Sequence, residues 1–323
     1  MSRILTGIQS TGTPHLGNIL GAIIPAIEMA NGSENESYLF IADMHSITQI
    51  KNPKELMFNT YSTAACWLAF GLDHSKTVFY KQSGVPQVTE LSWYLNCYFP
   101  YQRLTLAHSF KDKSSSLEDV NAGLFTYPML MAADILLYDA DIVPVGKDQL
   151  QHIEITRNVA SRFNNLNGDT FVIPDSKINE ISMLVNGTDG NKMSKSKNNV
   201  INIFLEEKLL KKQISSIKTD SLALESPKDW KACNLFNMYK LLADKNQVEI
   251  MKNNYEQGGY GYGHAKDDLL SLIITKYSIE REKYNYYMNN LDKIDGILKN
   301  GAERASQTAN KVLNRVRLKV GFN

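Results

Sequence analysis

Residues Gly7 to Gly21 read GIQSTGTPHLGNILG and join a predicted strand to a predicted helix. Apolar and β-branched residues from Arg3 to Gln9 predict a first strand, and apolar residues at helical spacing from Asn18 to Met29 predict a helix. Pro14 prevents that helix from beginning earlier. The glycines between the two elements let a ligand lie against the backbone, and the first helical amides are expected to be free to face it. We therefore expect a phosphate-like anion here.

Taken alone, the same loop also fits a second interpretation, in which its glycines serve only a tight turn. A Walker A loop is excluded, because Asn18 and Ile19 stand where that motif needs lysine and a hydroxyl residue. His15 adds an imidazole donor for a phosphate oxygen. The choice between a turn and a phosphate site therefore depends on the rest of the chain.

A second signal lies far downstream, where Lys192 to Ser196 read KMSKS. The preceding residues, 186–191, include two glycines that can act as hinges. We expect a mobile cationic loop over 187–200 that closes over a polyphosphate. A generic solvated basic loop is the alternative, and the glycine-rich first loop disfavours it.

Together the two stretches resemble the signatures of the class I aminoacyl-tRNA synthetases, which are a HIGH sequence near the first strand and a KMSKS loop. The second signature is matched letter for letter, and the first is matched as HLGN at His15–Asn18, with asparagine in place of the final histidine. That departure is similar to the tryptophan branch of the family. The resemblance continues through IADMHSIT at 41–48, MAADILLY at 131–138, VPVGKDQ at 143–149 and HIEITR at 152–157.

The resemblance implies that ATP activates L-tryptophan and that the acyl group then passes to the 3′ end of a tryptophan tRNA. The attacking carboxylate is already ionised at neutral pH, so catalysis needs alignment and positive charge rather than a base. Mg²⁺ bridging the ATP phosphates is expected, with no dedicated protein metal site. The family also works as a homodimer. The alternatives are the tyrosine branch and a non-catalytic nucleotide-binding or RNA-binding relative.

By the same resemblance, the two loops supply most of the expected ATP site. Residues Gly146 to Asp148 would take the ribose side, and the backbone of Ile181 would contact adenine. The catalytic set is His15, Lys113, Lys192 and Lys195. The full ATP-binding set is Gln9, Ser10, Thr11, Gly17, Asn18, Gly146, Lys147, Asp148, Ile181, Lys192, Met193, Ser194, Lys195 and Ser196. One departure is Lys197, which stands where the family usually has aspartate.

Asp134 is expected to select the amino acid. It lies in an apolar segment, 123–138, predicted to be helical, where a carboxylate is costly unless a donor pairs with it. An indole N–H is such a donor, and an unmatched analogue would leave the carboxylate unpaired. A structural ion pair is the alternative. The tryptophan-binding set also includes Met131 for the ring face, with His45 and Gln149 near the reacting end.

The 323-residue chain is long enough for two structural units. Strands expected at 3–9, 38–42, 77–81 and 141–145 alternate with helices, which predicts an α/β fold with a Rossmann-like, doubly wound parallel sheet. A Ser/Lys-rich segment is expected to be a flexible insertion. The expected parts are a catalytic domain at 1–186 with this insertion at about 109–121, the KMSKS loop at 187–200, a helical tRNA-binding domain at 201–292 and a C-terminal helix at 293–323.

Composition excludes several other classes of protein. Three widely spaced cysteines give neither a disulfide framework nor a zinc site. No apolar run approaches the ~20 residues of a membrane span, so we expect a cytoplasmic protein that does not contact a membrane. Because the net charge is only +1, RNA contacts must be local. The candidates for such contacts, with a solvated helix face as the alternative, are Lys208, Lys211, Lys212 and Lys218.

Overall fold

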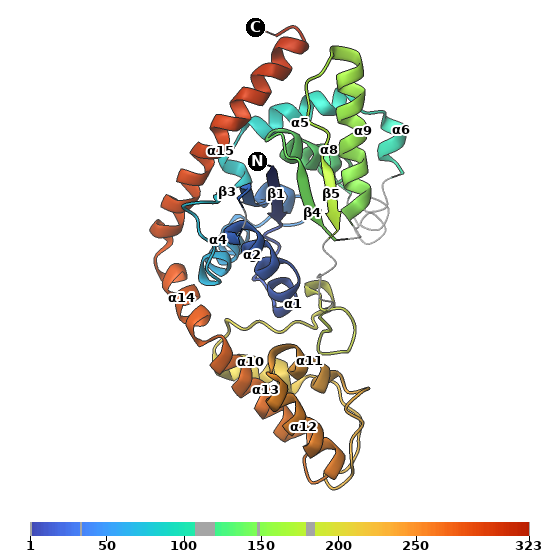
Figure 1. The fold of residues 1–323 in the computed structure, drawn as a ribbon, viewed down its shortest axis with the longest axis vertical. Coiled ribbons are helices and arrows are strands. Elements are labelled where there is room, and N and C mark those ends of the chain that lie inside the picture. Colours follow the sequence, from blue (N-terminus) through green and yellow to red (C-terminus); the bar gives the residue numbers. More distant parts are fainter. Residues whose placement is uncertain (1, 33, 107–119, 147–148, 179–184, 323) are drawn as a thin grey trace.

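The computed structural model describes residues 2–32, 34–106, 120–146, 149–178 and 185–322. Within these residues, five parallel strands form one sheet in the order β3-β2-β1-β4-β5 (Figure 1). The strands are β1 (Arg3–Ile8), β2 (Glu36–Ile41), β3 (Val78–Lys81), β4 (Ile142–Val145) and β5 (Asp175–Ile178). The predicted doubly wound parallel sheet is confirmed.

The edge strand β5 was not among the strands expected from sequence. Its sequence, DSKI, is short and largely polar, and the side chains of Asp175, Ser176 and Lys177 are exposed. It pairs only with β4 among the described strands. A strand of this kind lacks the apolar run that marks a buried strand, so periodicity cannot reveal it.

Helices cover both faces of the sheet, and the first of them is interrupted. Pro25 has no amide hydrogen, and the chain just before it takes a wider π-helical turn. The elements of this part are α1 (Leu16–Asn18), η1 (Ile19–Ile23), α2 (Ile24–Gly32), α3 (Asp43–Ser46), α4 (Pro53–Ala69), η2 (Gln82–Gly84), α5 (Gln87–Tyr98), α6 (Tyr101–Leu104), α8 (Ala122–Leu136), α9 (Leu150–Asn167) and η4 (Lys195–Lys197).

A second, helical unit follows the KMSKS loop and lies below the sheet in Figure 1. From there α14 and α15 run back along one side of the molecule to the level of the sheet (Figure 1). The elements are α10 (Glu207–Ser215), α11 (Asn234–Leu242), α12 (Lys245–Gln257), α13 (Tyr262–Lys276), α14 (Ser278–Asn289) and α15 (Leu291–Lys319). The predicted all-helical second unit is therefore confirmed.

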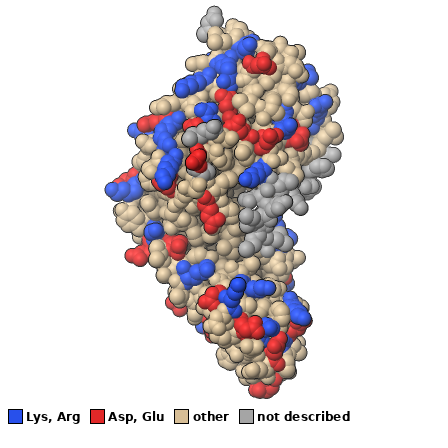
Figure 2. Space-filling view, in the orientation of Figure 1, with Lys and Arg blue, Asp and Glu red and all other residues tan. Residues whose placement is uncertain are grey.

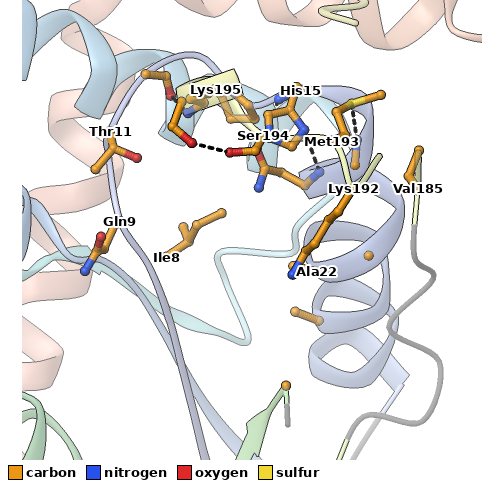
Figure 3. Close-up of a pocket in the computed structure, with 18 of the residues that line it drawn as sticks. Ile8, Gln9, Thr11, His15, Ala22, Val185, Lys192, Met193, Ser194 and Lys195 are labelled. Carbon is orange, nitrogen blue, oxygen red and sulfur yellow. Dashed lines mark hydrogen bonds between the residues drawn. The ribbon is translucent and has the colours of Figure 1, made fainter. Parts of the chain in front are cut away.

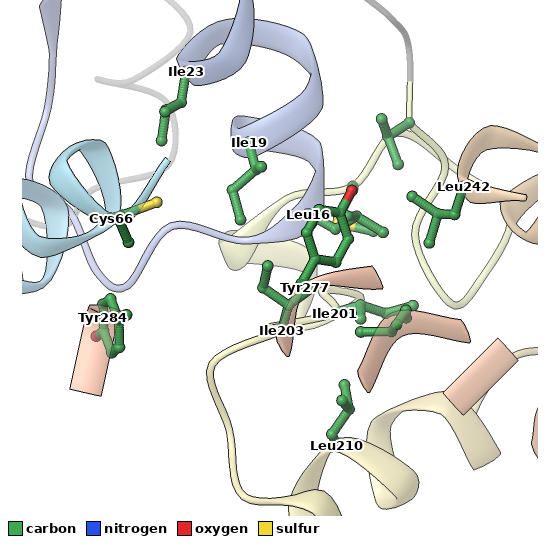
Figure 4. Close-up of a cluster of buried hydrophobic side chains, with 14 of the residues drawn as sticks. Leu16, Ile19, Ile23, Cys66, Ile201, Ile203, Leu210, Leu242, Tyr277 and Tyr284 are labelled. Atoms are coloured by element: carbon green, nitrogen blue, oxygen red, sulfur yellow. The ribbon is translucent and has the colours of Figure 1, made fainter. Parts of the chain in front are cut away.

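The core divides into two clusters because strand side chains alternate between the faces of the sheet. Tyr38 and Phe40 of β2 belong to one cluster, and Leu39 and Ile41 belong to the other. The second cluster continues without a break into the helical unit, where Leu16 and Ile19 lie near Ile201, Ile203 and Tyr277 (Figure 4). The KMSKS loop is therefore attached to a core that both units share.

The C-terminal helix α15 packs back onto the sheet domain. A Cβ atom at Gly301 would lie 1.7 Å from the carbonyl oxygen of Phe79 in β3, so only glycine permits this approach. Arg315 pairs with Asp139 at 2.5 Å, and Arg317 pairs with Glu90 at 2.6 Å. These arginines thus fasten the helix to the sheet domain. None of the described helices has the length and apolar character required to cross a membrane.

Candidate active site

A large cavity opens at the carboxyl ends of β1 and β4, where the strand order changes direction. Parallel α/β sheets bind ligands at this switch point. The cavity has a volume of about 1230 Å³ and is lined by Gln9 and Thr11 after β1, by Gly146 after β4 and by 192–197 (Figure 3). Lys192 extends from its loop into this space. Tertiary structure thus brings the two signature stretches into contact on the wall of one cavity.

His15 caps α1 and presents one ring nitrogen for a ligand. Its Nδ1 accepts the amide of Asn18 at 3.2 Å, and its own amide donates to Asn18 Oδ1 at 3.2 Å. The neutral ring must therefore carry its proton on Nε2, where it is a donor. Burial, together with the charge of Lys195, lowers the pKa of His15 to about 4. The asparagine that departs from HIGH completes this capping box.

The amides at the start of α1 are not free, so that part of the sequence prediction is wrong. The amide of Leu16 donates to the carbonyl of Ile201 at 2.8 Å. The amide of Gly17 contacts Met193 Sδ at 3.4 Å, and the amide of Asn18 is held by His15. These partners are far away in sequence or are side chains of the cap itself. In this conformation of the protein, a bound anion would therefore contact side chains rather than free helix amides.

The KMSKS loop is held at two points. Met193 is 4% exposed and packs into the core with Val185 and Leu16. Lys195 Nζ donates to the carbonyl oxygen of Gly12 at 2.7 Å, and burial lowers the pKa of Lys195 to about 8. The second lysine of the motif is thus already placed at the first loop. The expected mobility of this loop stays a prediction.

Most described ATP-site candidates line the cavity. Those that do so are Gln9, Thr11, His15, Gly17, Asn18, Gly146, Lys192, Met193, Ser194, Lys195 and Ser196. Ser10 does not, because it is fully buried and bonded to Ser46 and Thr60. Four candidates fall outside the described residues: Lys113, Lys147, Asp148 and Ile181.

The charge of the cavity suits a polyphosphate. Lys197, the departure from the family pattern, lines it together with Lys192 and Lys195. No Asp or Glu occurs among its described lining residues. The site therefore attracts anions and has no carboxylate among those residues to repel them.

Asp134 lies in a separate, buried polar cluster. It is 3% exposed, and its Oδ2 lies 2.8 Å from His45 Nε2. Gln82 Nε2 donates to both carboxylate oxygens, at 2.8 and 2.9 Å. Burial raises the pKa of Asp134, and the contacts with His45 and Gln82 oppose that rise. Sequence reasoning placed His45 near the substrate but missed Gln82, although its position directly after β3 was an available signal.

A second polar chain adjoins this cluster. His152 Nδ1 lies 3.0 Å from Gln149 Oε1, and its Nε2 lies 2.7 Å from the hydroxyl of Tyr127. The Tyr127 ring stands edge-on to His45, with ring centroids 6.2 Å apart. Met131 is half-buried on α8. Neither this chain nor the Asp134 cluster lines the 1230 Å³ cavity, so the structure separates two groups of predicted site residues.

The sequence matches one family model over residues 1–278, described as tRNA synthetases class I (W and Y). The chain belongs to this family of class I tRNA synthetases. It is 44% identical to the tryptophan–tRNA ligase of Campylobacter jejuni over 320 residues, covering 99% of this chain and 100% of the relative. It is also 44% identical to the ligase of Rhodopirellula baltica, covering 99% of each.

A solved class I synthetase structure agrees with this assignment. The tryptophanyl-tRNA synthetase of Campylobacter jejuni complexed with ADP and tryptophan matches with a TM-score of 0.95 at 44% identity, covering 99% of this chain and 100% of that one. The similarity therefore extends over both the sheet and the helical unit of the synthetase.

Proposed function

We propose that this synthetase is a tryptophan–tRNA ligase. It joins L-tryptophan to ATP to form tryptophanyl-adenylate and pyrophosphate, and it then transfers the acyl group to the 3′ end of a tryptophan tRNA. The observation that carries the proposal is the cavity at the β1/β4 switch point, which both signature loops line. The full-length ligase relatives at 44% identity support tryptophan over tyrosine as the substrate.

In the activation step, the carboxylate of tryptophan attacks the α-phosphorus and pyrophosphate leaves. Lys192 and Lys195 would stabilise the negative charge that develops on the phosphate oxygens. Lys195 would exchange the Gly12 carbonyl for a phosphate oxygen, a stronger acceptor. His15 would donate from Nε2, which the contact at Nδ1 leaves protonated. The roles of Lys113, Lys147, Asp148 and Ile181 on ATP stay proposals.

Mg²⁺ fits this site as a companion of ATP. Within the described residues, no three His, Cys, Asp or Glu side chains are grouped so that they could hold a metal. The described cavity lining offers no carboxylate. The phosphates and water would therefore bind the ion, which would neutralise part of the phosphate charge.

Selection of tryptophan would rest on Asp134. A carboxylate has about four acceptor positions, so the bonds from His45 and Gln82 leave capacity for an indole N–H. Those two side chains also fix the orientation of the carboxylate. Met131 would pack on the ring, and Gln149 would reach the amino end of the substrate.

The domain and assembly predictions are also retained as proposals. The domains would be 1–186, 187–200, 201–292 and 293–323. A homodimer is favoured by exposed aromatic side chains on neighbouring helices, since Trp93 of α5 is 68% exposed and Tyr101 of α6 is 67% exposed.

The helical unit would contact the tRNA backbone. Lys208, Lys211, Lys212 and Lys218 are all exposed, and Lys211 pairs with Asp267 at 2.9 Å. Figure 2 shows basic side chains interspersed with acidic ones over the helical part of this face. Contact with RNA would therefore be local and would weaken as salt rises.

Amino-acid-dependent exchange of pyrophosphate into ATP tests the proposal. The purified protein is assayed with tryptophan and tyrosine side by side. Exchange with tryptophan alone is expected. Exchange with tyrosine instead would overturn the substrate assignment, and ATP binding without exchange would favour a non-catalytic relative.

A further inference from the structure

Asn199 is a buried side chain that bonds both halves of the KMSKS loop. It is 2% exposed and lies just beyond the motif. Its Oδ1 accepts the amide of Ser194 at 2.7 Å, and its Nδ2 donates to the carbonyl of Lys192 at 3.2 Å. One amide group thus fixes the backbone of the first lysine and of the residue before Lys195.

Asp189 fixes that amide group from the other side. Its Oδ1 accepts Asn199 Nδ2 at 2.7 Å and the backbone amide of Asn191 at 3.0 Å, and its Oδ2 accepts the side-chain amide of Asn191 at 3.0 Å. Bonds from Asn191 and then Asn199 lower the pKa of Asp189 to about 2. An ionised carboxylate only accepts and the Ser194 amide only donates, so a single amide orientation satisfies both. An ionised aspartate at position 199 could not donate a hydrogen bond to Asp189.

The turn that carries Asp189 is attached to the helical unit. The side chain of Asn234, the first residue of α11, donates to the carbonyl of Gly187 at 2.9 Å. The amide of Lys218 donates to the carbonyl of Thr188 at 2.8 Å. A Cβ at Gly187 would lie 2.3 Å from Asn199 Cγ, so the turn packs directly on this side chain. The Asp189–Asn199 pair is therefore attached to the helical unit.

We propose that Asn199, held by Asp189, is the positioning residue that sets the geometry of the KMSKS loop, so that Lys192 and Lys195 face the cavity together. Met193 anchors the middle of the loop in the core, and Lys195 Nζ holds the loop at Gly12. Asn199 adds backbone attachments on both sides of Met193. It does not line the cavity itself, so it acts through the lysines. The inference rests on the proposed function, because its first test measures the catalysis that Lys192 and Lys195 are proposed to perform.

The test compares Asn199→Ala with Asn191→Ala in tryptophan-dependent exchange. Asn191 is an exposed asparagine whose side chain bonds the same carboxylate, and within the described part of the chain it makes no hydrogen bond to the lysine-bearing backbone. Removing Asn199 is expected to lower kcat about 10- to 100-fold, as for other residues that orient reacting groups, with KM for tryptophan unchanged. Asn191→Ala is expected to retain the wild-type kcat.

A pH series with Asn199→Asp separates positioning from a general loss of structure. The variant places a carboxylate against Asp189, where the amide of Asn199 now bonds the carbonyl of Lys192 and the amide of Ser194. Protonation of one carboxylate restores a donor between them. The kcat ratio of variant to wild type should therefore rise as pH falls. A flat ratio would overturn the proposal, even if Asn199→Ala fails to fold.

Hydrogen exchange supplies a readout that does not need activity. Amides of 192–198 should exchange faster in Asn199→Ala than in Asn191→Ala. If the wild type catalyses pyrophosphate exchange and Asn199→Ala matches it in both kcat and amide protection, the inference fails while the proposed function stands. If the wild type is inactive but the loop amides of Asn199→Ala still exchange faster than those of Asn191→Ala, the proposed function alone is refuted.

Discussion

The lowered pKa of Lys195 predicts that kcat/KM for ATP falls at alkaline pH. Burial lowers this pKa from 10.5 to about 8, because the ammonium group loses water when it packs against Gly12. Only the charged form can stabilise phosphate oxygens. In the free enzyme, kcat/KM for ATP should therefore be highest below pH 8 and should fall as pH rises through 8.

The size of this effect follows from simple titration. At pH 7 about nine-tenths of Lys195 is charged, and at pH 9 only about one-tenth is. The ratio predicts a roughly tenfold fall in kcat/KM for ATP between these two pH values. The fall in kcat should be smaller at saturating ATP, since bound phosphates favour the ammonium form. Initial rates of pyrophosphate exchange at a series of ATP concentrations measure both quantities.

The control is Lys195→Arg, because a guanidinium group stays protonated throughout this range. Its kcat/KM, whatever the absolute level, should stay flat between pH 7 and pH 9. An identical alkaline fall in the wild type and in this variant would assign the titration to another group. A flat wild-type profile would show that the ammonium group is better solvated than its contact with Gly12 implies.

Three further predictions address the substrate pocket, the loop anchor and the assembly. Asp134→Asn should lower kcat/KM for tryptophan by about 100-fold, since it removes a charged acceptor of a buried hydrogen bond, with little change in KM for ATP; equal loss for both substrates would contradict a role in selection. Met193→Ala should destabilise the protein by about 2–3 kcal/mol in urea unfolding, because it leaves a cavity at a side chain that is 4% exposed, whereas Leu209→Ala at a 49% exposed position should change little. Trp93→Glu should shift the sedimenting species from dimer to monomer if α5 forms the interface, and Tyr286→Glu, at an exposed site on α14, should leave the assembly intact.

Short-range features of this protein could be predicted from sequence. The first strand, the helix after Pro14 and the buried strand around Phe40 are marked by local apolar patterns, and each occurs in the structure. The strand β5 could not be found in this way, because an exposed edge strand of polar residues has no such pattern. The residue types of the two signature loops are enough to indicate the same chemistry.

Residue roles that depend on partners needed the tertiary structure. The buried position of Ser10 follows from its bonds to Ser46 and Thr60, and the pairing of Asp134 with Gln82 joins residues 52 positions apart. No local sequence pattern reveals either pairing, because a hydroxyl or amide side chain can form hydrogen bonds with many different partners.

Local sequence patterns were sufficient to predict the class of protein, four of the five described strands and the residue types of the two signature loops. Which groups remain available to a ligand depends on how distant segments pack. The tertiary structure directs the first α1 amides to Ile201, Met193 and His15, and it places Asn199 beneath the KMSKS loop. The physical reason is that propensity and periodicity act between near neighbours in the chain, whereas burial and hydrogen-bond pairing are settled when distant segments pack together.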